Sequence, residues 1–264
     1  MLIHPIKRRI KFKKNLCAYL VSGSEKIRSG FGNGDCLLLD FKNLIFAAAD
    51  ASERFPEASK LLLERFHYYL SLETNVISDI AFHEYLKNAW SEQNYNYKTT
   101  FSCVFLKQTA NGSVDVTIAN GGDSKVIIID LISGSIVFKT LADMNFAGRS
   151  KNLPKIDSIN INDKNLRIII TTDGFNDFFS NDFYQYLNLS SDNYINKILT
   201  EIDEKKEFID HDDIGMIILN PFSDYNGQKN IFLMGGTTPH EEYCYYAALK
   251  KIPKDDIITN TTPL

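Results

Sequence analysis

Four aspartates that lie far apart in the sequence each stand at the expected end of an apolar strand: Asp35, Asp50, Asp173 and Asp212. The clearest case is the segment LRIIITTDGFNDFF at 166–179, in which a β-branched run stops at the Asp-Gly pair that contains Asp173. One strand that ends in Asp-Gly is usually only a turn. Four carboxylates that converged on one site, however, would repel one another strongly unless a cation neutralised the group.

The chemistry that such a group of carboxylates can perform is metal-assisted. Hard oxygen ligands favour Mg²⁺ or Mn²⁺ over zinc, and the chain has only five His and four Cys residues to compete with them. Two such ions about 3.5–4 Å apart lower the pKa of a bridging water and hold the oxygens of a phosphate ester. The spacing of the aspartates alone supports this interpretation only weakly.

A predicted β-hairpin would bring two of the four aspartates together. The runs at 35–40 and 45–50 are apolar strands around a short polar turn. The first strand begins at Asp35 and the second ends at Asp50. Because the strands of a hairpin are antiparallel, both carboxylates are expected at the same end of the sheet.

The remaining elements follow from the spacing of the apolar residues. Helical spacing predicts helices over 56–72 and 77–93, which together form a layer on one sheet face. Further apolar runs predict strands at 16–21, 101–106, 114–119, 126–131 and 136–141, of which the last four are expected to form a β-meander. The polar stretch 142–165 is expected to be a surface loop, either functional or a solvated insertion. Beyond it we expect a helix within 181–203, a strand at 230–236 and a short helix at 240–251.

Size and charge limit the class of protein. With 264 residues, 44% of them hydrophobic, the chain can bury a full core as one large domain. We expect that domain to span 1–220, with 221–264 as an extension packed on the same domain. A net charge of −4 gives no global attraction to nucleic acid or to an anionic membrane. The basic stretch KRRIKFKK at 7–14 is either a solvated edge strand or a docking patch for acidic partners.

The cysteines and the hydropathy bear on the compartment. The four cysteines are scattered without C-x-x-C spacing, which argues against a zinc site and a disulfide framework and favours a reducing compartment. No apolar run approaches the roughly 18 residues of a membrane span, and the opening segment lacks a signal-peptide core. A cytoplasmic protein without a membrane span is therefore expected. The oligomeric state is left open by the sequence.

Six short segments carry a more specific signal because of their order. They are Asn33-Gly-Asp35, Ala48-Ala-Asp-Ala51, Thr99-Thr-Phe-Ser102, Gly121-Gly-Asp-Ser-Lys125, Thr172-Asp-Gly-Phe-Asn-Asp177 and His211-Asp-Asp-Ile-Gly215. They resemble, in the same order, the Asn-Glu-Asp, Val-Ala-Asp-Gly, Gly-Ser-Thr-Ala, Gly-Asp-Ser-Arg, Ser-Asp-Gly-Leu-Trp-Asp and Asp-Asn-Ile-Thr motifs of the PP2C (PPM) family of metal-dependent serine/threonine phosphatases. Six motifs in order are far more specific than any one of them.

The resemblance implies a fold and a metal site. The fold is α+β, a four-layer αββα sandwich of two antiparallel sheets flanked by helix pairs, with two Mg²⁺ or Mn²⁺ ions at one end. The implied ligands are Asp35, Asp50, Ala51 through its carbonyl, Asp123, Asp173 and Asp212. Among them, Asp50 would bridge both ions, Asp173 and Asp212 would complete the shell of the first, partly through water, and Asp35 would support a ligand water. A weaker third-metal position would match Asp123 together with Asp173.

Several positions depart from the family pattern. Gly34 replaces the Glu of the first motif, and Gly215 replaces the final Thr. Ser52 stands where many members carry a His proposed as general acid. The position of the phosphate-binding Arg is Gly30 here, so that Arg28 would reach the substrate phosphate only with a shift of two residues.

Two functions from different classes follow from the matches and the departures. The first is a metal-dependent phosphoprotein phosphatase, in which Asp50, Asp173 and Asp212 serve catalysis and a metal-activated water attacks phosphoserine or phosphothreonine directly. The second is a catalytically weak or inactive relative that acts as a regulatory or phospho-ligand binding module. The retained aspartates favour the enzyme, since a binding module does not need a repelling acidic cluster. The missing Arg and the altered segment after Asp50 favour the binding module. A chance cluster of solvated carboxylates is the third alternative.

Overall fold

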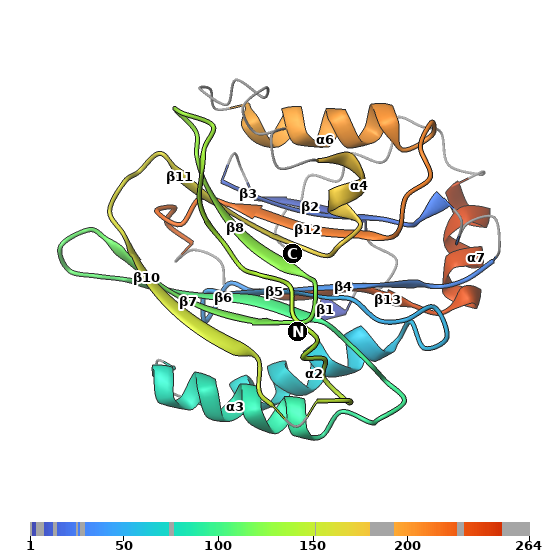
Figure 1. Cartoon of the computed structure of the whole chain (residues 1–264), viewed down its shortest axis with the longest axis horizontal. Helices are drawn as coiled ribbons and strands as arrows, with labels where there is room; N and C mark the ends of the chain where they lie inside the picture. The colour runs from blue at the N-terminus through green and yellow to red at the C-terminus, as the bar shows by residue number, and fades with distance from the viewer. Residues whose placement is uncertain are drawn as a thin grey trace.

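The chain folds as a four-layer sandwich in which two β-sheets pack face to face and helices cover both outer faces (Figure 1). The computed structural model describes residues 2–3, 8–12, 15–24, 26, 30–73, 77–150, 152–179, 193–225 and 230–249. The αββα architecture expected from the resemblance is confirmed. Among the described residues, no helix is both long enough and apolar enough to cross a membrane.

The first sheet, sheet A, has seven strands in the order β1-β13-β4-β5-β6-β7-β10. Their bounds are β1 Leu2–Ile3, β13 Ile231–Thr237, β4 Asn33–Asp40, β5 Ile45–Ala49, β6 Phe101–Gln108, β7 Val114–Gly121 and β10 Lys155–Ile161. Neighbouring strands are antiparallel except that the short β1 lies parallel to β13. The strand expected at 230–236 is therefore β13, which pairs with β4.

The second sheet, sheet B, has six antiparallel strands in the order β2-β3-β12-β11-β8-β9. Their bounds are β2 Arg9–Phe12, β3 Leu16–Val21, β12 Ile214–Leu219, β11 Leu166–Thr171, β8 Lys125–Asp130 and β9 Ile136–Lys139. The basic stretch at the start of the chain thus contributes an edge strand, β2.

Strand β4 shows how the layers are held together. Leu37 and Leu39 point into the core between the sheets, whereas Cys36 and Leu38 point to the helices outside sheet A. Successive side chains of a strand face opposite sides, and here both sides are buried. A strand buried on both faces reads as a continuous apolar run rather than as an alternation, and this explains the Cys-Leu-Leu-Leu sequence at 36–39.

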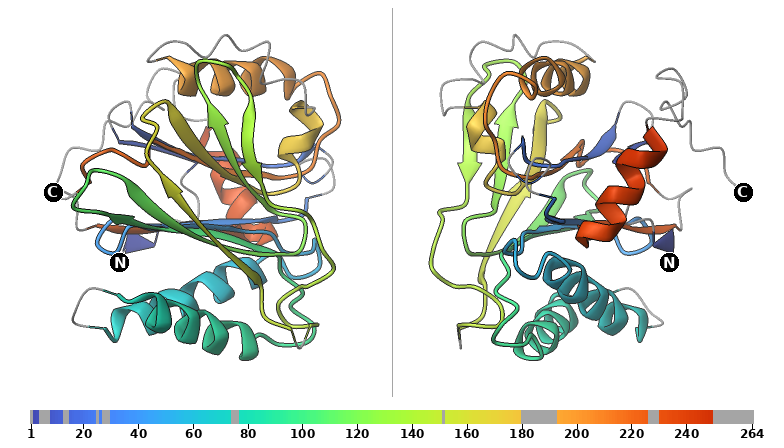
Figure 2. Two further views of the ribbon diagram at one scale, coloured as in Figure 1. Left: turned by 60° about the vertical axis from the view of Figure 1, so that its left-hand side comes forward. Right: turned by 90° about the vertical axis from the view of Figure 1, so that its right-hand side faces the viewer.

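Helices form the two outer layers, of which the amphipathic spacing predicts the one on sheet A and the family resemblance implies the other. α2 (Ala58–Ser71) and α3 (Asp79–Ser91) cover sheet A, and α4 (Phe175–Phe178) and α6 (Tyr194–Lys205) cover sheet B (Figure 1). The Ser78 side chain caps α3 by accepting a hydrogen bond from the amide of Ala81. α7 (Pro239–Leu249) stands beside the sandwich and contacts β13 (Figure 2). The part of the expected 181–203 helix before 193 lies outside the described residues.

Two expectations about the middle of the chain are wrong. The strands at 101–141 do not form a meander, because β6 and β7 belong to sheet A whereas β8 and β9 belong to sheet B. The chain crosses between the sheets at Gly121-Gly122, where the φ of +87° at Gly122 is a backbone conformation that favours glycine. In addition, 142–165 is not entirely a loop, since its second half forms β10, paired with β7 along its whole length.

Candidate metal centre

The hairpin of β4 and β5 delivers the first two aspartates. The register pairs Cys36 with Ala49, so the residues next to this pair, Asp35 and Asp50, lie opposite each other at one end of sheet A. Backbone hydrogen bonds extend the pairing past the strand end, because the amide of Ala51 donates to the carbonyl of Gly34 at 3.1 Å. The prediction that Asp35 and Asp50 share one end of the sheet is confirmed.

Three carboxylates from both sheets meet at this end. One carboxylate oxygen each of Asp50, Asp123 and Asp173 lies within 4.8 Å of the other two, and all three residues are partly exposed. Asp50 follows β5, Asp123 lies in the crossing between β7 and β8, and Asp173 follows β11. The sandwich thus brings together three aspartates that are separated by at least 50 residues in the sequence.

The carboxylates of this cluster disfavour one another's charge. Burial, followed by the charges of Asp123 and Asp212, raises the pKa of Asp173 from 3.8 to about 6. Burial, followed by the charge of Asp173, also raises the pKa of Asp50 well above its usual value. Because an opposite charge within about 4–6 Å favours the ionised form of a carboxylate, a bound cation would relieve this repulsion.

Asp35 gives an independent indication that a polar ligand belongs here. Its side chain is fully buried, and its Oδ2 accepts a hydrogen bond of 2.7 Å from the Thr172 hydroxyl. Its Oδ1 is buried and has no hydrogen-bond partner among the described residues. Burial, followed by the charge of Asp50, raises the pKa of this carboxyl. A buried oxygen of this kind normally has a hydrogen bond from a protein group or water, or contacts an ion. The aspartates of the centre offer only oxygen atoms as ligands, and such a set fits a hard divalent cation and its bound water.

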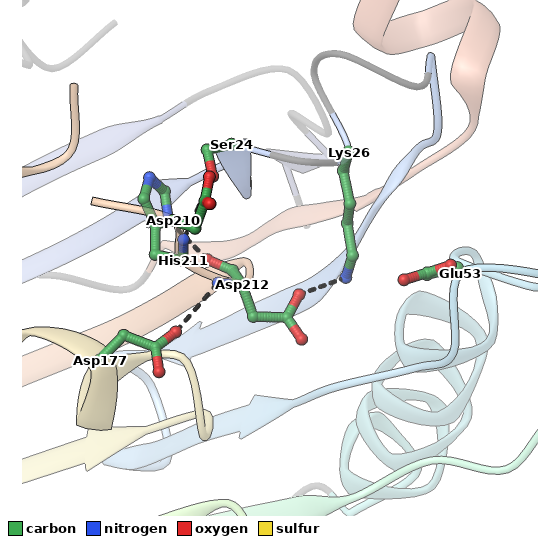
Figure 3. A pocket seen from close by; sticks show the side chains of 7 residues that line it. All are labelled: Ser24, Lys26, Glu53, Asp177, Asp210, His211 and Asp212. Carbon is green, nitrogen blue, oxygen red and sulfur yellow. Dashed lines mark hydrogen bonds and ion pairs between the residues drawn. The ribbon is translucent and has the colours of Figure 1, made fainter. Parts of the chain in front are cut away.

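Asp212 lies outside the three-carboxylate cluster and is held by a lysine. Its Oδ1 forms an ion pair of 2.7 Å with the Nζ of Lys26, and Figure 3 shows the two side chains pointing toward each other. The next residue, Asp213, is buried and accepts hydrogen bonds from the amides of Gly23 and Gly34, both at 2.7 Å. The Nζ of Lys26 also lies 2.9 Å from Asp213.

Lys26 and Asp213 were not predicted from the sequence. The adjacent pair Asp212-Asp213 just before an apolar strand is a signal for one of them, since neighbouring side chains of an extended backbone face opposite sides and one of the two is expected to point inward. Lys26 gives no such signal, because it stands in a polar stretch of the sequence without hydrophobic periodicity. Arg28, predicted to bind the substrate phosphate, lies outside the described residues, and its role stays a prediction.

Two open pockets adjoin Lys26. One, of about 340 Å³, is lined by Lys26, Asp50, Ala51, Ser52, Glu53, Arg54 and Asp212. The other, of about 220 Å³, is lined by Ser24, Lys26, Glu53, Asp177, Asp210, His211 and Asp212 (Figure 3). The first pocket gives an anion access to Asp50 and to two basic side chains, which is the setting that a phosphate ester bound through a cation would need.

A hydrogen-bonded path connects the last described helix to the centre. Glu242 of α7 is buried, and its carboxylate accepts hydrogen bonds from three side chains, those of Arg8, Ser22 and Thr237. The Ser22 hydroxyl in turn accepts a hydrogen bond of 3.0 Å from the side-chain amide (Nδ2) of Asn33. The Oδ1 of Asn33 accepts from the backbone amide of Asp35 at 2.9 Å. α7 therefore supports the strand end that carries Asp35.

Gly34 leaves no room for the Glu that the family motif has at this position. A Cβ on Gly34 would lie 2.2 Å from the carbonyl oxygen of Ala51 and 3.3 Å from the Oδ1 of Asp50. Contacts with backbone below 3.0 Å cannot be relieved by moving a side chain. The carbonyl of Ala51, implied as a metal ligand by the resemblance, thus lies against the Cα of Gly34, and its role as a ligand stays a prediction.

Gly34→Ala is expected to lower the free energy of unfolding by about 2–4 kcal/mol, because overpacking against backbone forces the β4–β5 hairpin apart. Gly215→Ala is the matched control, since its Cβ would lie 3.2 Å from its nearest neighbours, the Cβ of Asp35 and the Cδ2 of Leu37, both of which are side-chain atoms. We expect a loss of about 1 kcal/mol or less for this control. Urea denaturation of the two variants measures both values, and equal losses would contradict the steric argument.

Comparisons with known proteins agree with the architecture. No protein-family model and no curated protein sequence matches the chain. Solved structures do match: a bacterial serine phosphatase aligns with a TM-score of 0.60 at 14% identity, over 79% of this chain and 98% of the other. The PPM Ser-Thr phosphatase MsPP from Mycobacterium smegmatis aligns with a TM-score of 0.59 at 15% identity, over 81% and 99%. The catalytic domain of the phosphatase PstP, in complex with two manganese ions, aligns with a TM-score of 0.53 at 14% identity, over 78% and 98%. The chain therefore has the PP2C-like fold of the PPM serine/threonine phosphatases.

Proposed function

We propose that the protein is a Mg²⁺- or Mn²⁺-dependent phosphoprotein phosphatase that hydrolyses phosphoserine and phosphothreonine. The observation that carries this proposal is the cluster of Asp50, Asp123 and Asp173, contributed by both sheets at one end of a phosphatase-like sandwich. Similar structures are described as Ser/Thr phosphatases, and one of them contains two manganese ions. We propose two ions here as well, with Asp123 and Asp173 suited to a weaker third.

We assign metal binding, water orientation and phosphate binding to different residues of the centre. Asp50 and Asp173 would hold the ions, with Asp212 contributing once it is released from Lys26. Bound Mg²⁺ or Mn²⁺ would activate water for attack on phosphorus and offset the charge of the phosphate. The Oδ1 of Asp35, which has no hydrogen-bond partner among the described residues, can orient a water by accepting a hydrogen bond from it. Lys26 and Arg54, which line the larger pocket, would bind the phosphate oxygens through charge-assisted hydrogen bonds.

A non-catalytic function is the second candidate, and one observation favours it. Ser52, Glu53 and Arg54 line the pocket beside Asp50, so no histidine follows this aspartate as a proton donor. A protein of this kind would bind a phosphorylated ligand or regulate a partner without turnover. We further propose a cytoplasmic location, because the four cysteines are free and three of them are buried.

Turnover of an aryl phosphate by the purified protein tests the proposal. We expect activity with Mn²⁺ or Mg²⁺ and none after chelation, since the carboxylates alone can only repel a phosphate. Readdition of Mn²⁺ should restore the activity, which excludes irreversible unfolding by the chelator. Saturable Mn²⁺ binding without turnover would favour the binding module, whereas turnover that chelators do not affect would contradict the metal assignment.

A further inference from the structure

Lys26 places an ammonium group inside the acidic end of the sandwich. Only 7% of its side chain is exposed, and its Nζ pairs with two carboxylates at once, 2.7 Å from Asp212 and 2.9 Å from Asp213. Burial alone would lower the pKa of Lys26, but Asp213 and Asp212 outweigh this effect and hold the pKa above its usual value. The ammonium therefore stays charged at neutral pH.

The two carboxylate partners differ in how much they depend on the lysine. Asp213 is almost fully buried and keeps two further donors, the amides of Gly23 and Gly34. The side chain of Asp212 is 51% exposed and borders both pockets. Loss of Lys26 would leave Asp213 satisfied by backbone, while it would free the Asp212 carboxylate for another cation.

The positive charge of Lys26 also acts on the other carboxylates of the centre. Burial raises the pKa of Asp35, Asp50 and Asp173, and at all three residues the positive charge of Lys26 opposes that rise. Lys26 thus supplies part of the positive charge that these carboxylates need before an ion binds. A divalent cation that reached Asp212 would do the same more strongly, and would also repel the ammonium.

We propose that Lys26 is a tethered counter-ion that a divalent cation displaces from Asp212 when the centre loads. This inference rests on the proposed function, because the proposed function makes Asp212 a ligand of the metal. The four-carbon stem of a lysine allows the movement, since its ammonium is a point charge without fixed geometry. Lys26 lines the larger pocket together with Asp50 and Arg54, so the displaced ammonium would face a phosphate that enters this pocket. Metal loading and phosphate binding are coupled by this exchange, and coupling of this kind is reciprocal.

Mn²⁺ titration of the full-length protein, with free Mn²⁺ followed by electron paramagnetic resonance, tests the exchange. We expect Lys26→Gln to bind Mn²⁺ about tenfold more tightly than the wild type, because the ion no longer competes with an internal cation. Lys26→Arg keeps the charge and should bind within about twofold of the wild type. Lys125→Gln is the matched control: the Nζ of Lys125 donates to Asn176, and its charge acts on Asp173 and Asp123. Its removal should tighten binding by no more than about threefold.

The outcomes separate this inference from the proposed function. Binding by the wild type with equal or weaker binding by Lys26→Gln would overturn the exchange and leave the metal centre intact. An equal gain in Lys125→Gln would also overturn it, because the effect would then be one of net charge. Binding by Lys26→Gln but not by the wild type would support the exchange. If neither protein bound Mn²⁺, both the exchange and the proposed function would fall.

A measurement on the wild type covers the case in which Lys26→Gln does not fold. An amine-reactive acetylating reagent modifies exposed lysines, and mass spectrometry of peptides reports each site. We expect modification of Lys26 to increase at least fivefold when Mn²⁺ is present, while that of Lys125 in the same digest changes little. An unchanged or lower modification of Lys26 would overturn the proposal.

Discussion

Asp173→Asn is expected to raise the melting temperature of the metal-free protein and to abolish most of the gain that millimolar Mn²⁺ gives the wild type. The pKa of Asp173 is raised in the folded protein from 3.8 to about 6, so its ionised form is less favourable there than in the unfolded chain. The resulting cost to stability is absent below pH 3.8 and fully present above about pH 6. At pH 7, after an allowance for solvent screening, it amounts to about 1–2 kcal/mol.

The same substitution should have the opposite effect on function. An amide binds a divalent cation more weakly than a carboxylate does, and we expect turnover of an aryl phosphate to fall by about 10³-fold or more. Asp115→Asn is the control. It replaces an aspartate by asparagine in the same way, but at an exposed position near the start of β7, at the end of the strand away from the metal centre. Differential scanning fluorimetry with and without Mn²⁺ measures the stabilities. An equal Mn²⁺ shift in the wild type and in Asp173→Asn would remove Asp173 from the metal site.

A strong preference for aryl phosphates over phosphoserine peptides is the second expected result. Phosphoserine expels a basic alkoxide, which benefits from a proton donated in the transition state, an effect of about 10²–10⁴-fold. Ser52, which lines the pocket beside Asp50, is a poor proton donor at neutral pH. A phenoxide is a stable leaving group and needs mainly the activated water and charge neutralisation. We therefore expect metal-dependent aryl phosphatase activity and much slower cleavage of phosphoserine peptides.

Ser52→His should raise the rate of cleavage of the phosphoserine peptides selectively and leave the rate on the aryl phosphate nearly unchanged. Ser52→Ala is the control, and it should behave as the wild type on both substrates because the hydroxyl takes no part in proton transfer. Steady-state rates on the two substrates, expressed as a ratio for each variant, provide the measurement. Equal cleavage of both substrates by the wild type would mean that water or another residue supplies the proton.

The elements that carry the aspartates could be predicted because their signals are local. The apolar runs on either side of residues 41–44 fix the β4–β5 hairpin, and its register follows from the short turn. Whether Asp50, Asp123 and Asp173 meet depends instead on how two sheets pack, and only the resemblance to a family indicated it. The crossing at Gly121-Gly122 was mistaken for a hairpin turn, because a Gly-rich turn has the same composition in both settings.

The features that the sequence did not reveal lack periodicity or apolar content. β10 is an edge strand of sheet A that is exposed or half-exposed except at its last residue, and its mostly polar sequence was interpreted as a loop. Lys26 becomes a partner of Asp212 and Asp213 only through the path of the segment that connects β3 to β4. Since the path of a connecting segment depends on tertiary contacts rather than on the spacing of residue types, the sequence could not have assigned this ion pair.

The buried carboxylate of Glu242 defines how much of the chain the centre requires. It joins α7 to the start of β2 and to the end of β3, and through Ser22 and Asn33 it supports the backbone amide of Asp35. The adjoining strand β13 occupies the place in sheet A between β1 and β4. A shortened protein that ended after β12 would keep all four aspartates of the initial pattern, yet it would expose one edge of β4 and leave Asn33 without its link to α7. We therefore expect the smallest unit that keeps this centre intact to extend through α7, which supports the strand end that carries Asp35.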